Sequence, residues 1–153
     1  MGTITVRPPR ADDLAPLVEV YVGARRSYYD GHLPEEELAE WERSARSLGD
    51  DIFDRPGRVW LCADLDHELA GFAQVRESGE LGLLHVAPAH WGNGVGLALH
   101  GAAVDALRGL GVSTAHLDVF AHNHRARRFY LARGWREVGA DESHVRMALD
   151  LDV

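Results

Sequence analysis

The sequence has 153 residues, 46% of them hydrophobic and 26% charged, which predicts one globular domain over residues 1–153 and excludes a fibrous or disordered chain. Its formal net charge of −8 argues against a nucleic-acid partner, because an acidic surface repels phosphodiester backbones. All 16 basic residues are arginine, so Schiff-base and P-loop lysines are excluded. The chain has a single cysteine, Cys62, and shows no signal-peptide pattern, which predicts a cytoplasmic protein. No apolar run approaches the roughly 20 residues that span a bilayer, so we expect no membrane partner.

The first half of the chain predicts a strand, two helices and three further strands. Ile4 and Val6 alternate with polar residues and predict a short first strand. Apolar residues spaced three and four apart over residues 14–22 predict a first helix, and Pro34 opens a second helix that Gly49 ends. The hydrophobic period then changes to two, which predicts strands at residues 59–63, 69–75 and 80–86.

The second half predicts two helices and three strands. After a loop at residues 87–94, a helix presents one apolar face and ends at Gly111; its expected buried residues are Leu99, Ala103, Leu107 and Leu110. A strand at residues 113–120, a helix at 124–133 and strands at 135–138 and 144–151 follow. The order β-α-α-β-β-β-α-β-α-β-β indicates an α/β (α+β) protein with a mixed sheet. Its βαβ unit, residues 80–120, predicts a right-handed parallel crossover.

The most informative stretch is the glycine loop at residues 91–97, where three alternate glycines directly precede a helix. Glycine lets a ligand approach the main chain, and the first turn of a helix presents unpaired N–H groups and a positive dipole end. The loop therefore predicts an anionic phosphate ligand, with a tight turn that binds nothing as the alternative. An NAD-dependent oxidoreductase is disfavoured, because the third glycine comes one residue too early for the dinucleotide fingerprint.

Two linked segments, residues 81–97 and 123–135, resemble the GNAT superfamily of N-acetyltransferases, and the similarity covers essentially the whole chain. The resemblance implies a mixed, largely antiparallel central sheet of about seven strands with about four helices. It also implies acetyl-CoA as cosubstrate, with its pyrophosphate bound by the loop amides. The family usually has Arg or Gln where this chain has Trp91, so we expect that side-chain contact to be lost while the main-chain amides remain.

The resemblance further implies that main-chain groups of the central strand bind the pantetheine arm of CoA. The expected CoA contacts are Leu84, His85, Val86, Trp91, Gly92, Asn93, Gly94, Val95, Gly96, Leu97, Asn123, Ala126, Phe129, Tyr130 and Arg133. Asn123 is also suited to cap the helix that follows it. The charge pattern independently favours a phosphate ligand, since four arginines lie close together in an otherwise acidic chain: Arg125, Arg127, Arg128 and Arg133. They can bind CoA phosphates, or form a solvated face paired with nearby acids.

For catalysis, the resemblance implies that Tyr130 donates a proton or a hydrogen bond to the CoA sulfur. The usual tyrosine pKa of about 10 exceeds that of a thiol, about 8.5, so hydrogen bonding is the expected role. The resemblance implies Glu80, at the start of the central strand, as a base that acts through water. His85 is the other candidate base, because its usual pKa of about 6.5 suits it to deprotonate an amine through water. A solvated Glu80 without catalytic function is the alternative.

The resemblance also implies an acceptor pocket formed by the first two helices, their connection and late strand loops. The candidate contacts are Tyr28, Tyr29, His32 and Trp41, and the expected partner is a small-molecule or peptide amine. Nine histidines invite a metal site, but acetyl transfer needs none and no zinc motif is present, so we expect no metal. The leading hypothesis is direct transfer in a ternary complex, without participation of Cys62. A catalytically inactive CoA-binding or interaction module is the alternative, and homodimers are frequent in the family.

Overall fold

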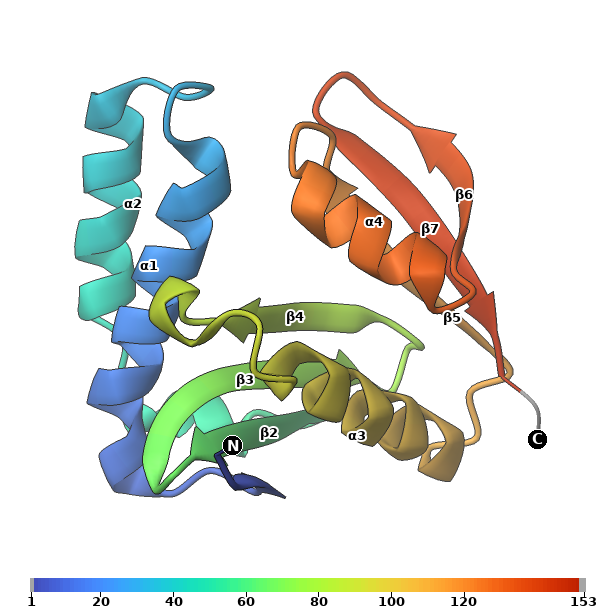
Figure 1. Cartoon of the computed structure of the whole chain (residues 1–153), viewed down its shortest axis with the longest axis horizontal. Coiled ribbons are helices and arrows are strands. Elements are labelled where there is room, and N and C mark those ends of the chain that lie inside the picture. Colours follow the sequence, from blue (N-terminus) through green and yellow to red (C-terminus); the bar gives the residue numbers. More distant parts are fainter. Residues whose placement is uncertain (1, 152–153) are drawn as a thin grey trace.

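The computed structural model describes residues 2–151 and contains two antiparallel sheets and four helices (Figure 1). The first sheet has the order β1-β2-β3-β4, with β1 (Ile4–Arg7), β2 (Arg58–Leu65), β3 (Glu68–Arg76) and β4 (Leu81–Val86). The second has the order β5-β7-β6, with β5 (Thr114–Phe120), β6 (Arg136–Ala140) and β7 (His144–Asp150). The helices are α1 (Leu14–Tyr29), α2 (Glu35–Arg46), α3 (Val95–Gly109) and α4 (His124–Ala132). The predicted fold class is confirmed.

Among residues 2–151, strand pairing between the two sheets is confined to the point where β4 begins. A parallel bridge joins Glu80 to His116, and the His116 N–H donates to the Gly79 carbonyl at 3.0 Å. Within the described chain, pairing between β4 and β5 goes no further, so the central sheet is divided there. The predicted parallel relation holds at the bridge, and the divergence beyond it exposes one edge of β4 next to α4 (Figure 1).

Helices α1 and α3 cover opposite faces of the first sheet because the side chains of β2 and β3 alternate. Cys62 and Phe72 are fully buried on the α1 face, while Ala63 and Ala73 are fully buried toward α3. The α3 face is lined by small residues, which lets the helix approach the sheet closely. Further along α3, Leu107 packs into the core of the second sheet. Helix α3 therefore connects both sheets and fixes its own N-terminus beside β4.

Some element ends differ from the predictions. Helix α2 ends at Arg46 instead of reaching Gly49. Leu110, expected in the core, is 41% exposed because it lies at the C-terminal cap of α3, where Gly111 adopts a φ of +81° and turns the chain. None of the helices formed by residues 2–151 combines the length and apolar character that a bilayer crossing needs.

Candidate active site

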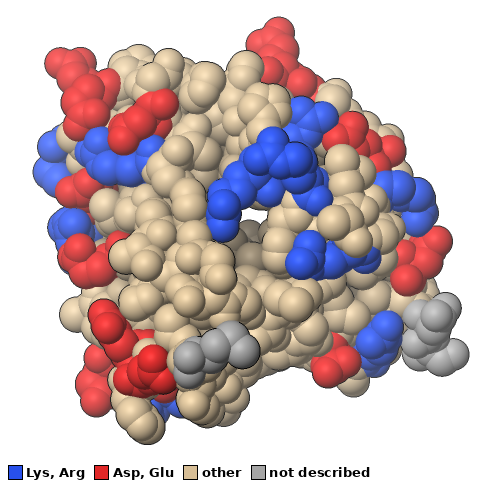
Figure 2. All heavy atoms as spheres, in the orientation of Figure 1, with Lys and Arg blue, Asp and Glu red and all other residues tan. Residues whose placement is uncertain are grey.

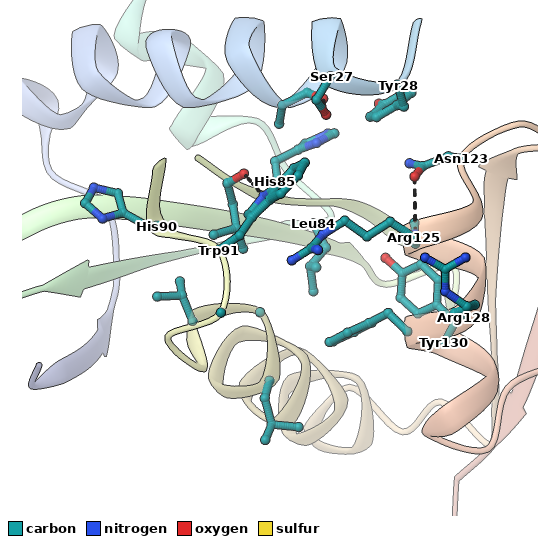
Figure 3. A pocket seen from close by; sticks show the side chains of 18 of the residues that line it. Ser27, Tyr28, Leu84, His85, His90, Trp91, Asn123, Arg125, Arg128 and Tyr130 are labelled. Carbon is teal, nitrogen blue, oxygen red and sulfur yellow. Dashed lines mark hydrogen bonds between the residues drawn. The ribbon is translucent and has the colours of Figure 1, made fainter. Parts of the chain in front are cut away.

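A cavity of about 660 Å³ lies where β4 diverges from β5 (Figure 3). Its walls come from α1, β4, the loop before α3, and α4. The lining residues are Ala24, Ser27, Tyr28, Leu84, His85, Val86, His90, Trp91, Gly92, Gly94, Val95, Gly96, Leu97, Asn123, Arg125, Ala126, Arg128, Phe129, Tyr130 and Arg133. The structure thus brings the glycine loop and the Asn123 helix, the two segments singled out in the sequence, to one site.

The charge of the cavity wall is positive. Arg125, Arg128 and Arg133 belong to the lining, and within the part of the chain described no Asp or Glu does. Figure 2 shows arginine side chains bordering an opening in the middle of this face. Arg127 differs from its neighbours: its Nη2 atom pairs with Glu137 at 2.8 Å, outside the cavity. The alternative of a paired surface arginine therefore describes Arg127. Among residues 2–151 none of the other three pairs with a carboxylate, although Arg133 donates from Nη1 to the Phe129 carbonyl at 2.9 Å.

The exposed edge of β4 presents main-chain groups to the cavity. The Ala87 N–H donates to the Ala70 carbonyl at 2.8 Å, so the antiparallel pairing directs the N–H and C=O groups of Ala87 and His85 toward β3. Leu84 and Val86, which alternate with His85 and Ala87 along the strand, direct their N–H and C=O groups toward the gap. Main-chain contacts were expected from all three residues 84–86, but the His85 groups face the neighbouring strand.

The glycine loop leaves the N-terminus of α3 open to the cavity. Gly92 and Gly94 have φ angles of +82° and +86°, which residues with a Cβ rarely adopt. Ala98 donates the first helical hydrogen bond, to the Gly94 carbonyl at 3.0 Å, so the three preceding N–H groups have no partner within the helix. Asn93, an expected CoA contact, lies outside the cavity; its Nδ2 atom donates to the His90 carbonyl at 3.0 Å and stabilises the turn.

Trp91 bridges the loop and β4. Its Nε1 atom donates to the Val86 carbonyl at 3.0 Å, and the guanidinium carbon of Arg125 lies 4.0 Å from the centre of its ring. Figure 3 shows Trp91 and Arg125 meeting in the middle of the site, although they come from opposite walls. Trp91 is itself neutral, but the guanidinium of Arg125 from α4 stacks on its ring and places a positive charge at this point of the loop.

Helix α4 contributes Asn123 and Tyr130. The Asn123 Oδ1 atom accepts a hydrogen bond from the Ala126 N–H at 3.2 Å, which confirms the expected cap. Tyr130 is 7% exposed, and its hydroxyl points into the cavity (Figure 3). Burial raises the pKa of Tyr130 above its usual value, so the hydroxyl keeps its proton at every pH at which a protein normally works.

His85 directs its side chain to the α1 side of the sheet. The ring packs against Tyr21 and Phe72, with centroid distances of 5.1 and 5.5 Å, and lies below Ser27 and Tyr28 in Figure 3. Burial, together with a smaller effect of the nearby Arg25 charge, lowers the pKa of His85 to about 3. The imidazole is therefore neutral at physiological pH and holds a proton only weakly.

Glu80 is placed away from these groups. Its Oε1 atom accepts a hydrogen bond from Arg146 Nη2 at 2.7 Å, and it lies at the bridge that joins the two sheets. It is not part of the cavity lining. The carboxylate is engaged in a salt bridge at the closed end of the gap, so its position does not support the expected role as base. Of the two candidates, the structure brings only His85 to the cavity.

Of the four residues expected to contact the acceptor, one lines the cavity and three do not. Tyr28 lines the cavity, whereas Tyr29 is buried against Phe120 with a centroid distance of 4.5 Å. His32 stacks on His122 at 4.4 Å, outside the lining. These placements do not support Tyr29 and His32 as acceptor contacts within the cavity.

Trp41 belongs to a separate, smaller pocket of about 330 Å³, lined by residues of α1 and α2 and by Leu33. The Arg25 guanidinium lies 4.3 Å from the centre of its ring. Sequence reasoning missed Ala24 and Ser27, which line the cavity together with Tyr28. Spacing was a signal for Ala24, because residues four apart lie on the same face of a helix. Ser27, one position before Tyr28, had no such signal.

No group of three or more His, Cys, Asp or Glu side chains among residues 2–151 is arranged to hold a metal ion. The nine histidines are distributed over the chain. His85 and His90 line the cavity, and His100 accepts a hydrogen bond from Trp135 in the core.

Comparison with known proteins identifies the family. The sequence model described as the acetyltransferase (GNAT) family matches residues 17–135. The chain belongs to the GNAT acetyltransferase family. No curated protein matches this GNAT chain in sequence.

Solved structures of similar proteins support the same fold. The PaiA N-acetyltransferase from Thermoplasma acidophilum, solved in complex with coenzyme A, is 25% identical, with a TM-score of 0.86 over 97% of this GNAT chain and 99% of the other. YncA, a putative acetyltransferase from Salmonella typhimurium solved with its cofactor acetyl-CoA, is 20% identical, with a TM-score of 0.68 over 99% and 95% of the two chains. At that identity, the second comparison shows the fold alone.

Proposed function

We propose that this protein is an acetyl-CoA-dependent N-acetyltransferase that transfers the acetyl group to a primary amine of a small molecule or peptide by direct attack in a ternary complex. One observation carries the proposal: the unpaired N–H groups of α3, the outward main-chain groups of β4 and the Tyr130 hydroxyl all face one positively charged cavity. The cysteine of the protein, Cys62, is buried and forms no disulfide, which supports a cytoplasmic location.

The cavity fits acetyl-CoA, which supplies the activated acetyl thioester. The N–H groups of Val95, Gly96 and Leu97 suit a pyrophosphate, because the helix dipole and free donors both favour an anion. A Cβ on Gly96 would lie 3.6 Å from Phe129 Cε1 and 3.7 Å from Val86 Cγ2. Glycine therefore keeps open the space between the loop and α4 where the pantetheine arm is expected.

In the proposed transfer the acceptor nitrogen forms a bond to the acetyl carbon, the carbon–sulfur bond breaks, the amine gives up a proton and the sulfur gains one. The outward N–H group of either Leu84 or Val86 is suited to donate to the developing oxyanion, since residues two apart on a strand lie too far apart for both to reach one oxygen. Tyr130 is placed to donate its hydroxyl proton, or a hydrogen bond, to the departing sulfur. Its raised pKa makes the hydrogen bond the main contribution.

The amine side of the reaction lies toward α1. His85 is neutral, so it can accept a hydrogen bond from the amine and orient it, but its lowered pKa disfavours holding the proton. The lining has no carboxylate among residues 2–151, and Arg25 adds positive charge behind His85. This environment disfavours an ammonium and favours binding of the neutral amine, whose proton passes to water.

The test begins with calorimetric titration of acetyl-CoA, CoA, dephospho-CoA and NAD, followed by an amine screen that detects release of the CoA thiol. Saturable binding of acetyl-CoA but not NAD, with turnover of at least one amine, is the expected result. Folded protein that binds no CoA would overturn the proposal. Binding without turnover across a broad amine screen would favour the inactive module, for which the poor basicity of His85 is the relevant observation.

A further inference from the structure

The contact between Trp91 and Arg125 joins two walls of the cavity. Trp91 is the first residue of the glycine loop, and Arg125 lies in the first turn of α4. The guanidinium carbon lies 4.0 Å from the centre of the indole ring. Such a distance is within the range of a cation–π interaction. Both side chains belong to the cavity lining, so the contact lies beside the space proposed for CoA.

Trp91 is itself fixed in place. Its Nε1 atom donates to the Val86 carbonyl at 3.0 Å, one of the main-chain groups on the open edge of β4. The ring is 37% exposed, so burial alone does not determine its orientation. The hydrogen bond to β4 therefore holds the indole as a platform against which the guanidinium rests.

The donors of Arg125 remain free. Stacking uses the flat face of the guanidinium and leaves its five N–H donors, which lie in the plane, to other partners. Among residues 2–151 no carboxylate pairs with Arg125, whereas Arg127, two positions along the same helix, pairs with Glu137. Arg125 is thus an unpaired cation that is held over the cavity by the indole, although the residue is exposed to solvent.

We propose that Trp91 is a positioning residue that holds Arg125 so that Arg125 binds the CoA pyrophosphate, a contact that determines affinity for phosphate-bearing forms of the cosubstrate. This inference rests on the proposed function. The pyrophosphate is the expected target because Trp91 directly precedes Gly92, and the free N–H groups at the start of α3 follow within the same loop. Arg125 then supplies from α4 the positive charge that the indole at position 91 lacks.

The first test compares the affinities of Arg125→Gln and unsubstituted protein for CoA, dephospho-CoA and pantetheine. We expect about tenfold weaker binding of both CoA and dephospho-CoA, since a charge-assisted hydrogen bond to phosphate is lost. Binding of pantetheine, which has no phosphate, should not change. Arg127→Gln is the matched control, because it removes the same charge from the same helix outside the cavity, and it should leave all three affinities within twofold.

The second test examines Trp91. Trp91→Leu should weaken CoA binding about as much as Arg125→Gln, and the double variant should lose little more, because the indole acts through Arg125. Trp91→Arg combined with Arg125→Gln should recover most of the affinity by returning a cation to the same place. A merely structural role for Trp91 would not produce this recovery, nor would it spare pantetheine.

Three outcomes would overturn the inference. Unchanged CoA affinity in Arg125→Gln would show that Arg125 makes no phosphate contact. A loss confined to CoA, with dephospho-CoA unaffected, would assign Arg125 to the 3′-phosphate instead. Equal loss for pantetheine would indicate a general distortion of the cavity. Failure of the unsubstituted, folded protein to bind CoA is a different result, because it refutes the proposed function itself.

Discussion

The Trp135 indole donates a hydrogen bond to the His100 imidazole, with 2.9 Å between Trp135 Nε1 and His100 Nε2. Trp135 is 2% exposed and His100 8% exposed, so the bond lies in the core. It joins α3 to the chain that follows α4, and these two helices carry the glycine loop and Tyr130. Because Nε2 accepts the bond, the neutral ring of His100 carries its proton on Nδ1.

Because His100 is buried as a neutral acceptor, we expect the free energy of unfolding to fall in mild acid. Burial lowers the pKa of His100, so the unfolded state, with a pKa of about 6.5, takes up the proton first as the pH falls. Unfolding then becomes easier by up to about 1.4 kcal/mol per pH unit for each such histidine. His85 acts in the same direction. Urea unfolding between pH 7.5 and 5 measures this slope.

The variant His100→Gln keeps an acceptor for Trp135 without a group that titrates in this range. We expect a flatter dependence of the unfolding free energy on pH above 5, with some loss of stability at pH 7.5. Carboxylates with lowered pKa values, such as Asp13, contribute at lower pH and do not interfere. An unchanged slope in the variant would contradict the assignment of the proton uptake to His100.

The sequence predicted the elements well because the apolar pattern is local. Strands β2 and β3 alternate between two buried faces, and the glycine loop directly precedes α3, so each signal lies within a few residues. Contacts between distant segments carry no such signal. Glu80 fitted the expected position of a base, but its partner Arg146 lies 66 residues away and only the folded chain shows the pair.

The adjacent pair Tyr28 and Tyr29 illustrates a second limit. Successive residues on a helix point about 100° apart, so one of the two faces the cavity and the other the core. Composition and spacing do not decide which, because the direction depends on how α1 lies against β4. The sequence did not predict the contact between Trp91 and Arg125 for the same reason, because the two side chains come from different elements.

Tyr130→Phe tests the proposed donor to the sulfur. We expect the turnover number to fall about 10²-fold, which is typical of losing one positioned acid or donor. The affinity for CoA should stay within twofold, because the ring and its packing against Trp135 are kept. Steady-state kinetics and calorimetry measure the two effects. Tyr29→Phe is the matched control, since it removes a hydroxyl from a buried tyrosine outside the cavity. Turnover within twofold of the original in Tyr130→Phe would refute the role.

Cys62→Ala tests direct transfer without an acyl-enzyme. Cys62 is fully buried in β2 on the α1 face, away from the cavity lining, and burial raises the pKa of its thiol to about 12. Turnover should be unchanged, while the unfolding free energy falls by about 1 kcal/mol, as is typical of a small core truncation. The native thiol should also resist labelling until urea unfolds the chain. Abolished turnover in a folded variant that still binds CoA would indicate a covalent intermediate on Cys62.

His85→Asn tests how the amine loses its proton. The pKa of His85 is about 3, so the ring stays neutral between pH 5 and 9 and adds no step to the pH profile there. We expect kcat/KM to rise about tenfold per pH unit while the acceptor is an ammonium, and to level off near the pKa of the amine. The variant should lower the plateau, because a hydrogen-bond acceptor near Tyr28 is altered, but leave the midpoint unchanged. An acceptor amine of lower pKa should shift the midpoint downward in both proteins. If the acid limb disappeared in His85→Asn, the histidine itself would be the ionising base, and transfer from a neutral bound amine would be wrong.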